Sequence, residues 1–97
     1  MHVRHMTLRV KEVNIDRLID VLRYSVIPAA EKQEGFASFI VMSEREADKV
    51  ICISMWNTEA DMLASEREAF FQEQVSRIIA LVAGPPQIEH YQVDVLS

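Results

Sequence analysis

The side chains best suited to acid–base or metal chemistry in this sequence are three histidines and one cysteine. His2, His5 and His90 carry imidazoles, the groups most used for proton transfer near neutral pH. His5 and His90 fall in segments that are expected to form neighbouring strands, on the less apolar face of each. No carboxylate at a fixed spacing completes a metal site around them. A structural or interface role is therefore favoured for both, and no metal is expected.

Cys52 is the only cysteine, which excludes a disulfide within the chain and a cysteine-based metal cluster. It stands in the apolar run 50–53, so a buried and unreactive thiol is favoured. The sequence has no phosphate loop, dinucleotide fingerprint, nucleophile elbow or His-Glu-x-x-His pair. An enzyme made from this chain would therefore need a substrate that supplies much of the reactivity itself, such as a phenol or enol that O₂ can attack.

Length and charge limit the classes of protein that remain. With 97 residues, the chain is expected to form a single domain over 1–97, since either half would be too small to bury a core. The formal net charge of −5, without a basic cluster, argues against nucleic acid as a partner. The apolar runs have the length of strands, so no membrane span is expected, and the first residues lack the apolar region of a signal peptide. The expected location is the cytoplasm.

The first third of the chain predicts a strand and then a helix. Residues 2–10 alternate, with one apolar face and one polar face, as a half-buried strand does. Asn14 is expected to cap a helix whose apolar residues recur at helical spacing through 15–26. Pro28 removes a backbone donor, so the helix should bend or restart there. Gly35 suits the left-handed position at the end of this helical region.

The remainder predicts a hairpin, a second helical region and a last strand. Strands are expected over 36–42 and 49–56, joined by a charged turn over 43–48. Thr58 with Asp61, and again Ser65 with Glu68, resemble capping boxes, which predict a short helix and then a longer one within 58–82. The sequence 84–86 (Gly-Pro-Pro) ends that region, and residues 87–96 alternate again.

The predicted order is βαββαβ, an α+β fold with a ferredoxin-like four-stranded antiparallel sheet and helices on one face. The two central hairpin strands, Phe39 to Met42 and 50–53, are apolar on both sides. Because alternate residues point to opposite faces, both surfaces of the sheet should be dry, and the helices can cover only one. A homodimer through the sheet faces is the expected solution. The alternative is that strand twist and long side chains hide the second face.

Three short patterns make the sequence similar to the antibiotic biosynthesis monooxygenase-like (ABM) family, whose members form a dimeric α/β barrel. They are Pro28 followed by Glu-Gly-Phe at 34–36, Ser-Met-Trp-Asn at 54–57 with helix-starting residues after it, and a Phe-containing helix before a final alternating strand. The haem-degrading branch of the family uses an Asn in the first strand and a Trp and a His in the second helical region. Here Met6 stands in that strand and region 58–82 has neither residue, so haem is not expected as a cofactor.

The resemblance implies a pocket between sheet and helices that could hold a small aromatic or quinone-like ligand, with no cofactor. Met6 and Leu8 would form its floor and Tyr24 and Phe70 its walls, with Trp56 near one end. Arg67 could pair with a substrate oxyanion. For Trp56, Tyr24 and Arg67 a packing or surface role remains the favoured alternative, because Arg67 lies between two glutamates and Trp56 ends a strand.

Three functions stay open. The first is a cofactor-independent monooxygenase, which needs an enclosed pocket of roughly 300 Å³ or more with convergent polar groups. The second is a non-catalytic ligand-binding or stress-response dimer, which needs the pocket without an ionisable group at its centre. The third is a purely structural association domain. The deciding observation is whether the space between sheet and helices is open or filled by Phe70, Phe71, Met6 and Met62.

Overall fold

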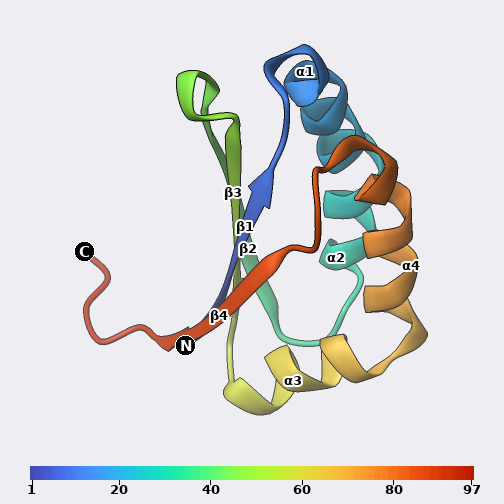
Figure 1. Cartoon of the computed structure of the whole chain (residues 1–97). Coiled ribbons are helices and arrows are strands. Elements are labelled where there is room, and N and C mark those ends of the chain that lie inside the picture. The colour runs from blue at the N-terminus through green and yellow to red at the C-terminus, as the bar shows by residue number, and fades with distance from the viewer.

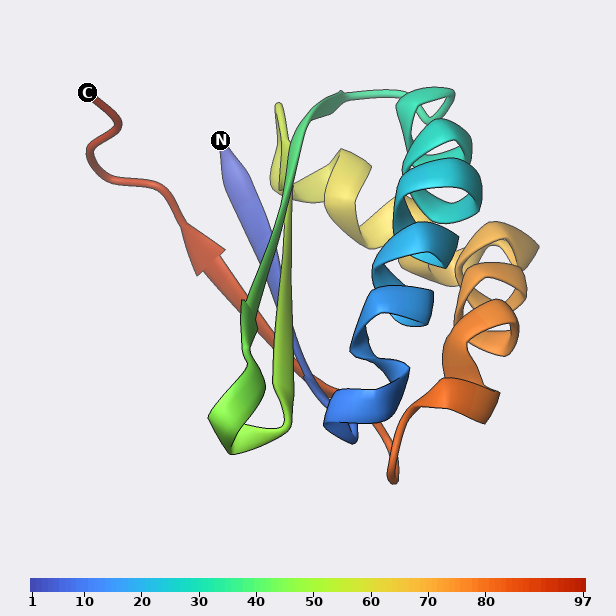
Figure 2. The ribbon, with the colours of Figure 1, turned by 90° about the horizontal axis from the view of Figure 1, so that it is seen from above.

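The computed structural model describes all residues, 1–97, and has the expected α+β, ferredoxin-like architecture. Its strands form one antiparallel sheet in the order β2-β3-β1-β4, and all helices lie on one side of it (Figures 1 and 2). None of the helices has both the length and the apolar character needed to cross a membrane. In chain order the elements are β1 (His2–Arg9), α1 (Glu12–Val21), a π-helical turn (Leu22–Val26), α2 (Ile27–Glu31), β2 (Phe36–Glu44), a 3₁₀ turn (Arg45–Ala47), β3 (Lys49–Trp56), α3 (Glu59–Arg67), α4 (Ala69–Ile78), a second 3₁₀ turn (Ile79–Leu81) and β4 (Gln87–Gln92).

Strand alternation decides which side chains enter the core. In β3, Val50, Cys52 and Trp56 are buried beneath the helices, whereas the residues between them are only partly covered. The strand pairing carries this division to β1 and β2, because Met6 is opposite Cys52, and Cys52 is opposite Val41. The core therefore lies between the sheet and the helix layer.

The start of α1 differs from the sequence prediction. The helix begins at Glu12, so Asn14 lies inside its first turn and caps nothing. Lys11 occupies the N-cap position without a side-chain hydrogen bond. Asp48, from the turn between β2 and β3, supplies the missing acceptor: its Oδ1 accepts the backbone N–H of Glu12 at 3.1 Å. A tertiary contact thus replaces the local cap that the sequence suggested.

The interruption at Pro28 is confirmed and takes the form of a π-helical turn. The wider turn over Leu22–Val26 precedes Pro28, which lies in the first turn of α2, where its missing N–H is tolerated. Gly35 follows with φ +79°, and a Cβ there would collide with Asp61. Glycine is required at this position by both the backbone angle and the approach of α3.

The second helical region contains one correct and one wrong cap prediction. Thr58 Oγ1 accepts the backbone N–H of Asp61 at 3.1 Å and starts α3, as expected. Ser65 does not start a helix: the break falls at Glu68, whose backbone is extended, and α4 begins at Ala69. β4 ends at Gln92 rather than at 96, and beyond it the Val93 N–H still donates to the Met1 carbonyl at 3.0 Å.

No helix covers the face of the sheet opposite the helix layer (Figure 2), and apolar residues of β2 and β3 lie on that face. Ile40 pairs with Ile53, and Met42 pairs with Ile51, across β2 and β3. Ile40 and Met42 are 40% and 43% exposed. We call this surface, formed by Ile40, Met42, Ile51, Ile53 and Met55, the open face.

Candidate functional site

A cavity of about 50 Å³ lies between the sheet and the helices, at the position where the sequence predicted a pocket. Ten of its thirteen lining residues are hydrophobic, and they come from β1, β2, β3, the π-helical turn, α2 and α4. The lining comprises Arg4, Met6, Leu22, Val26, Ala30, Phe39, Cys52, Ser54, Phe70, Phe71, Gln74, Val75 and Ile78. Of the four residues that could fill this space, Met6, Phe70 and Phe71 line the cavity, while Met62 is buried without lining it.

Arg4 is the charged group of this cavity, and it is 6% exposed. Its guanidinium lies 5.4 Å from the ring centre of Trp56 and 4.9 Å from that of Phe71, so aromatic faces flank the cation. Its Nη1 donates to Ser65 Oγ at 2.9 Å. Burial lowers the pKa of Arg4, and the nearby Glu66 carboxylate opposes this change. An arginine keeps its charge under such conditions, so the cavity wall carries a fixed positive charge.

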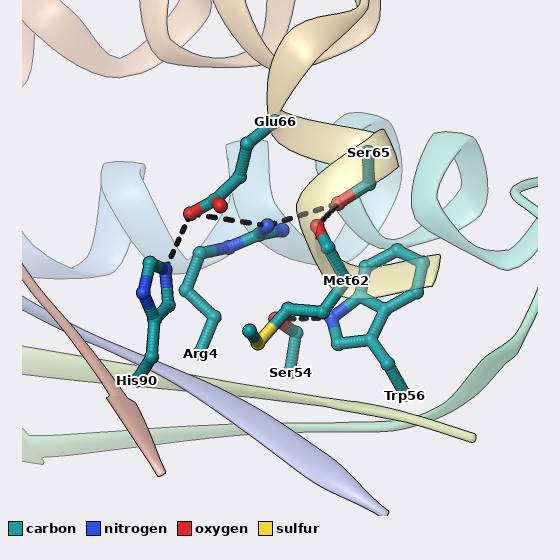
Figure 3. Close-up of polar contacts among 7 residues, drawn as sticks. All are labelled: Arg4, Ser54, Trp56, Met62, Ser65, Glu66 and His90. Atoms are coloured by element: carbon teal, nitrogen blue, oxygen red, sulfur yellow. Dashed lines mark hydrogen bonds and ion pairs between the residues drawn. The ribbon is translucent and has the colours of Figure 1, made fainter. Parts of the chain in front are cut away.

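Glu66 connects this cation to the protein surface. Its Oε1 lies 3.7 Å from Arg4 Nη1 and 2.7 Å from His90 Nε2, as Figure 3 shows. Glu66 is 18% exposed and His90 is 41% exposed at the side chain. Ser65, which accepts from Arg4, donates its own hydroxyl hydrogen to the carbonyl of Met62 within α3 at 2.7 Å. The network fixes Arg4 from the end of α3 and from the edge strand β4.

Trp56 has a packing role in this structure. It is fully buried, its Nε1 donates to Ser54 Oγ at 3.0 Å, and its ring meets Phe36 edge to face at 5.7 Å between centres. It does not line the cavity. Trp56 is connected to the cavity through Arg4, whose guanidinium lies against the Trp56 ring (Figure 3).

Gln74 and Cys52 are the remaining groups of chemical interest at the cavity. Gln74 on α4 is 7% exposed, and its buried Oε1 accepts no hydrogen bond. Cys52 on β3 is 4% exposed, and burial raises the pKa of its thiol to about 12. The thiol is therefore neutral and a poor nucleophile at ordinary pH, as the sequence indicated.

Three sequence candidates lie away from the cavity. Leu8 is 1% exposed and belongs to the core cluster rather than to the cavity lining. Tyr24 is 72% exposed on the π-helical turn, where the guanidinium of Arg23 lies 5.8 Å from its ring centre. Arg67 is exposed at the end of α3. Of the proposed floor and walls, Met6 and Phe70 are the two residues that the structure brings together at the cavity.

His5 and His90 lie on neighbouring strands, but their side chains point to opposite faces of the sheet. His90 pairs with Arg4 and reaches Glu66 on the helix side. His5 lies on the other side, where its ring meets Tyr91 edge to face at 6.1 Å. There the hydrogen bond from the Tyr91 hydroxyl to Glu89 raises the pKa of Tyr91. The two histidines therefore cannot share one ligand, and no group of three or more His, Cys, Asp or Glu side chains could hold a metal ion.

Sequence reasoning missed Arg4, Gln74 and Glu66, although two of them left a signal. Arg4 belongs to the inward-facing set of β1 together with Met6 and Leu8, so a charge stands at a core position. Gln74 lies one helical turn from Phe70 and one from Ile78, within the apolar stripe of α4. A polar residue at a core position is the pattern that marks such sites. Glu66 gave no signal, because it is one of several charges around the end of α3.

Solved structures share this fold over nearly the whole chain. A protein of Nitrosomonas europaea, provisionally named an antibiotic biosynthesis monooxygenase, superposes with a TM-score of 0.78 at 14% identity, over 98% of this chain and 100% of that one. A similarly named protein of Deinococcus radiodurans gives 0.80 at 15% identity, over 100% and 96%. One from Bordetella bronchiseptica gives 0.73 at 20% identity, over 97% and 98%. At these identities the likeness concerns the fold.

Among curated proteins no sequence matches this one. The family assignment comes instead from the sequence model of the antibiotic biosynthesis monooxygenases, which matches residues 1–77. That range includes β1 to β3, α3 and most of α4, and therefore every residue that lines the cavity except Ile78. The chain belongs to the antibiotic biosynthesis monooxygenase family.

Proposed function

We propose that the protein is a cofactor-independent monooxygenase that oxidises a small aromatic or quinone-like compound in the cavity between sheet and helices. The observation that carries this proposal is the buried side chain of Arg4, the one charged residue in the lining of a cavity in which ten of thirteen lining residues are hydrophobic. A fixed positive charge in a dry site stabilises a phenolate far better than water does. Membership of a family that takes its name from monooxygenases supports the choice of reaction.

The reaction needs no external reductant. A dihydroxyaromatic compound that reacts with O₂ at a ring C–H gives a hydroxyquinone and water. The substrate loses one C–H and one O–H hydrogen, one oxygen atom forms the new carbonyl, and the other leaves with both hydrogens as water. The substrate supplies all the electrons, so the protein has only to bind the anion, hold it next to O₂ and exclude water. Arg4 would face the anionic oxygen, while Met6 and Phe70 would contact the ring.

The cavity must widen to accept such a ring. Its volume of about 50 Å³ is well below the roughly 300 Å³ expected of an enzyme pocket and also below the ~150 Å³ of a protein cavity that holds benzene. The half-buried Phe70 and Phe71 form the α4 side of the lining, and they are the side chains whose rotation would enlarge it. We therefore expect Phe70→Ala to bind aromatic compounds more readily than the native chain does.

The experiment is a thermal-shift screen over phenols, quinones and flavonoids, followed by oxygen consumption with every compound that binds. We expect binding of dihydroxyaromatic compounds and oxygen uptake without added metal or flavin. Arg4→Met should abolish the uptake, and Arg67→Met, which removes an exposed arginine outside the cavity, is the matched control. Absence of uptake with every ligand that binds would overturn the catalytic proposal.

A second function, non-catalytic binding of the same class of compound, is favoured by one observation. No carboxylate or imidazole lines the cavity, and the thiol that does has a pKa raised to about 12. The cavity therefore lacks a group that could take the proton of a phenol. Binding without oxygen consumption would establish this function in place of oxidation.

We further propose that the protein is a homodimer that buries the open face. The support is the row of Ile40, Ile51, Ile53 and Met42, which the helices of the same chain cannot reach. Twice the chain mass of 11.1 kDa, about 22 kDa, is the expected particle. A cytoplasmic location stays a prediction from the sequence.

A further inference from the structure

We propose that Gln74 selects the ligand by accepting a hydrogen bond from it, while Arg4 contacts a second oxygen that is ionised or part of a carbonyl. The ligand class is then a planar compound with both a hydroxyl donor and such an oxygen, for example a dihydroxybenzene monoanion or a hydroxyquinone. The inference rests on the proposed function in one respect: it places the ligand in the same cavity.

The first argument is the state of the Gln74 side chain. The residue is 7% exposed, lines the cavity and has a buried Oε1 without a hydrogen-bond partner. Buried acceptors in folded proteins nearly always have a partner, because leaving one unpaired costs free energy. A ligand hydroxyl that reaches Oε1 once the cavity widens would remove that cost. The native protein is therefore organised to gain more from a donor-bearing ligand than from an apolar one.

The other polar groups of the cavity already have partners. Arg4 is held by Ser65 and Glu66, and its side chain is part of the cavity lining. The Ser54 hydroxyl accepts from Trp56. With ten of thirteen lining residues hydrophobic, the cation of Arg4 and the acceptor of Gln74 are the two features that can orient a ligand. One attracts an electron-rich oxygen and the other attracts a donor, which is the combination that a partly ionised diol offers.

Cys52 is compatible with a quinone-like ligand. A quinone reacts readily with a thiolate, and Cys52 lines the same cavity. Its burial favours the neutral thiol, with a pKa of about 12. A quinone could therefore occupy the cavity without being trapped covalently.

The first test uses the stability of the protein without ligand. Gln74→Met keeps the length of the side chain and removes the unpaired acceptor, so the melting temperature should rise by about 4 °C or more. Gln72→Met, on the exposed side of the same helix, is the matched control and should change the melting temperature far less. An unchanged or lower melting temperature for Gln74→Met relative to Gln72→Met would overturn the inference, because Oε1 would then already be satisfied, for instance by water.

The second test uses binding under anaerobic conditions, where no turnover occurs. Catechol and hydroquinone are titrated into the native protein and both variants, with their dimethyl ethers as donor-free controls. Gln74→Met should lose about tenfold or more in affinity for the diols and little for the ethers. Equal loss for diols and ethers, or no loss, would overturn the inference while leaving oxidation untouched.

Oxygen consumption separates the two proposals. Donor-dependent binding without uptake would keep the role of Gln74 and remove the oxidation. If no compound of either series binds the native protein, both fall together.

Discussion

The two faces of the sheet differ in how fully the rest of the chain covers them. Beneath the helices, Val50, Cys52 and Trp56 are almost fully buried, and that core is closed within one chain. On the open face, Ile40 and Met42 are about two-fifths exposed, although they are as apolar as the residues below. Neighbouring residues of one strand thus lie on faces that differ in burial. The covered face stabilises the single chain, whereas the open face is the surface through which we propose that a second copy binds.

The covered face also contains the polar exceptions. Arg4, Ser54 and Gln74 lie among its apolar residues, and all three line the same cavity. A core built for stability alone would place apolar side chains at these positions. In these proposals, ligand binding accordingly lies on the covered face and assembly on the open face.

The largest effect is expected from Cys52→Asp on the covered face. An unpaired carboxylate in this core should cost about 4 kcal/mol or more, because nothing nearby can pair with it except the already engaged Arg4. Most of the protein should be unfolded at 25 °C by circular dichroism. A cooperatively folded Cys52→Asp with near-native stability in urea would show that the covered face is not a closed core.

The adjacent change, Ile53→Asp, should act on assembly instead. Its side chain lies on the open face, where water can solvate the carboxylate once the partner leaves. We expect a folded monomer and a dimer dissociation constant raised by about 100-fold or more, measured by sedimentation. Val13→Asp changes an 84% exposed residue of α1 and is the control. A native chain that sediments as a monomer at micromolar concentration would refute the role given to the open face.

Alkaline pH should weaken the covered face in particular. The folded protein retains the Cys52 proton up to a pKa of about 12, whereas the unfolded thiol releases it near 9.0. Between these pH values the unfolded state binds fewer protons than the folded state. The free energy of unfolding should therefore fall as pH rises from about 9 towards 12, by up to ~1.4 kcal/mol per pH unit. Cys52→Val should lose stability less steeply between pH 8 and pH 10 in urea titrations. Parallel slopes for the two proteins would contradict the burial of the thiol.

The smallest effect is expected at the start of α3, which belongs to the helix layer over the covered face. Thr58→Ala removes the side-chain oxygen that accepts the Asp61 N–H and should cost about 1 kcal/mol. The sedimentation behaviour should stay unchanged, because Thr58 belongs to the helix layer. Gln72→Ala, at an exposed position of α4 away from the caps and from the open face, provides the comparison. A shift in the dimer equilibrium with Thr58→Ala would mean that the two faces are coupled.

Local patterns predicted most of the fold because each has a local cause. The alternation of β3, the bend at Pro28, the cap at Thr58 and the left-handed Gly35 all depend on residues that are close in sequence. The errors had tertiary causes. The start of α1 depends on Asp48, and the extent of β4 depends on its pairing with β1.

The candidate site was less predictable, because its contacts join residues that are far apart in the sequence. Met6 and Phe70 could be placed at the cavity, since strand and helix periodicity determine which side of an element faces the core. The contact of Arg4 with Ser65 joins residues 61 positions apart, and that of Glu66 with His90 joins residues 24 apart. No pattern along a single sequence records such pairs. Tyr24, expected as a wall of the pocket, is instead 72% exposed on the π-helical turn.

The hydrogen bonds between Asp48 and the start of α1 have a consequence for local unfolding of the chain. Asp48 accepts the Glu12 N–H through its side chain and the Val10 N–H through its carbonyl, at 3.1 Å and 2.8 Å, and Arg45 pairs with Asp16 at 2.8 Å nearby. The tip of the β2–β3 hairpin and the first turn of α1 thus share their hydrogen bonds. They should open as one cooperative unit in native-state hydrogen exchange, so that the amides of Val10 and Glu12 are released together when the hairpin tip moves.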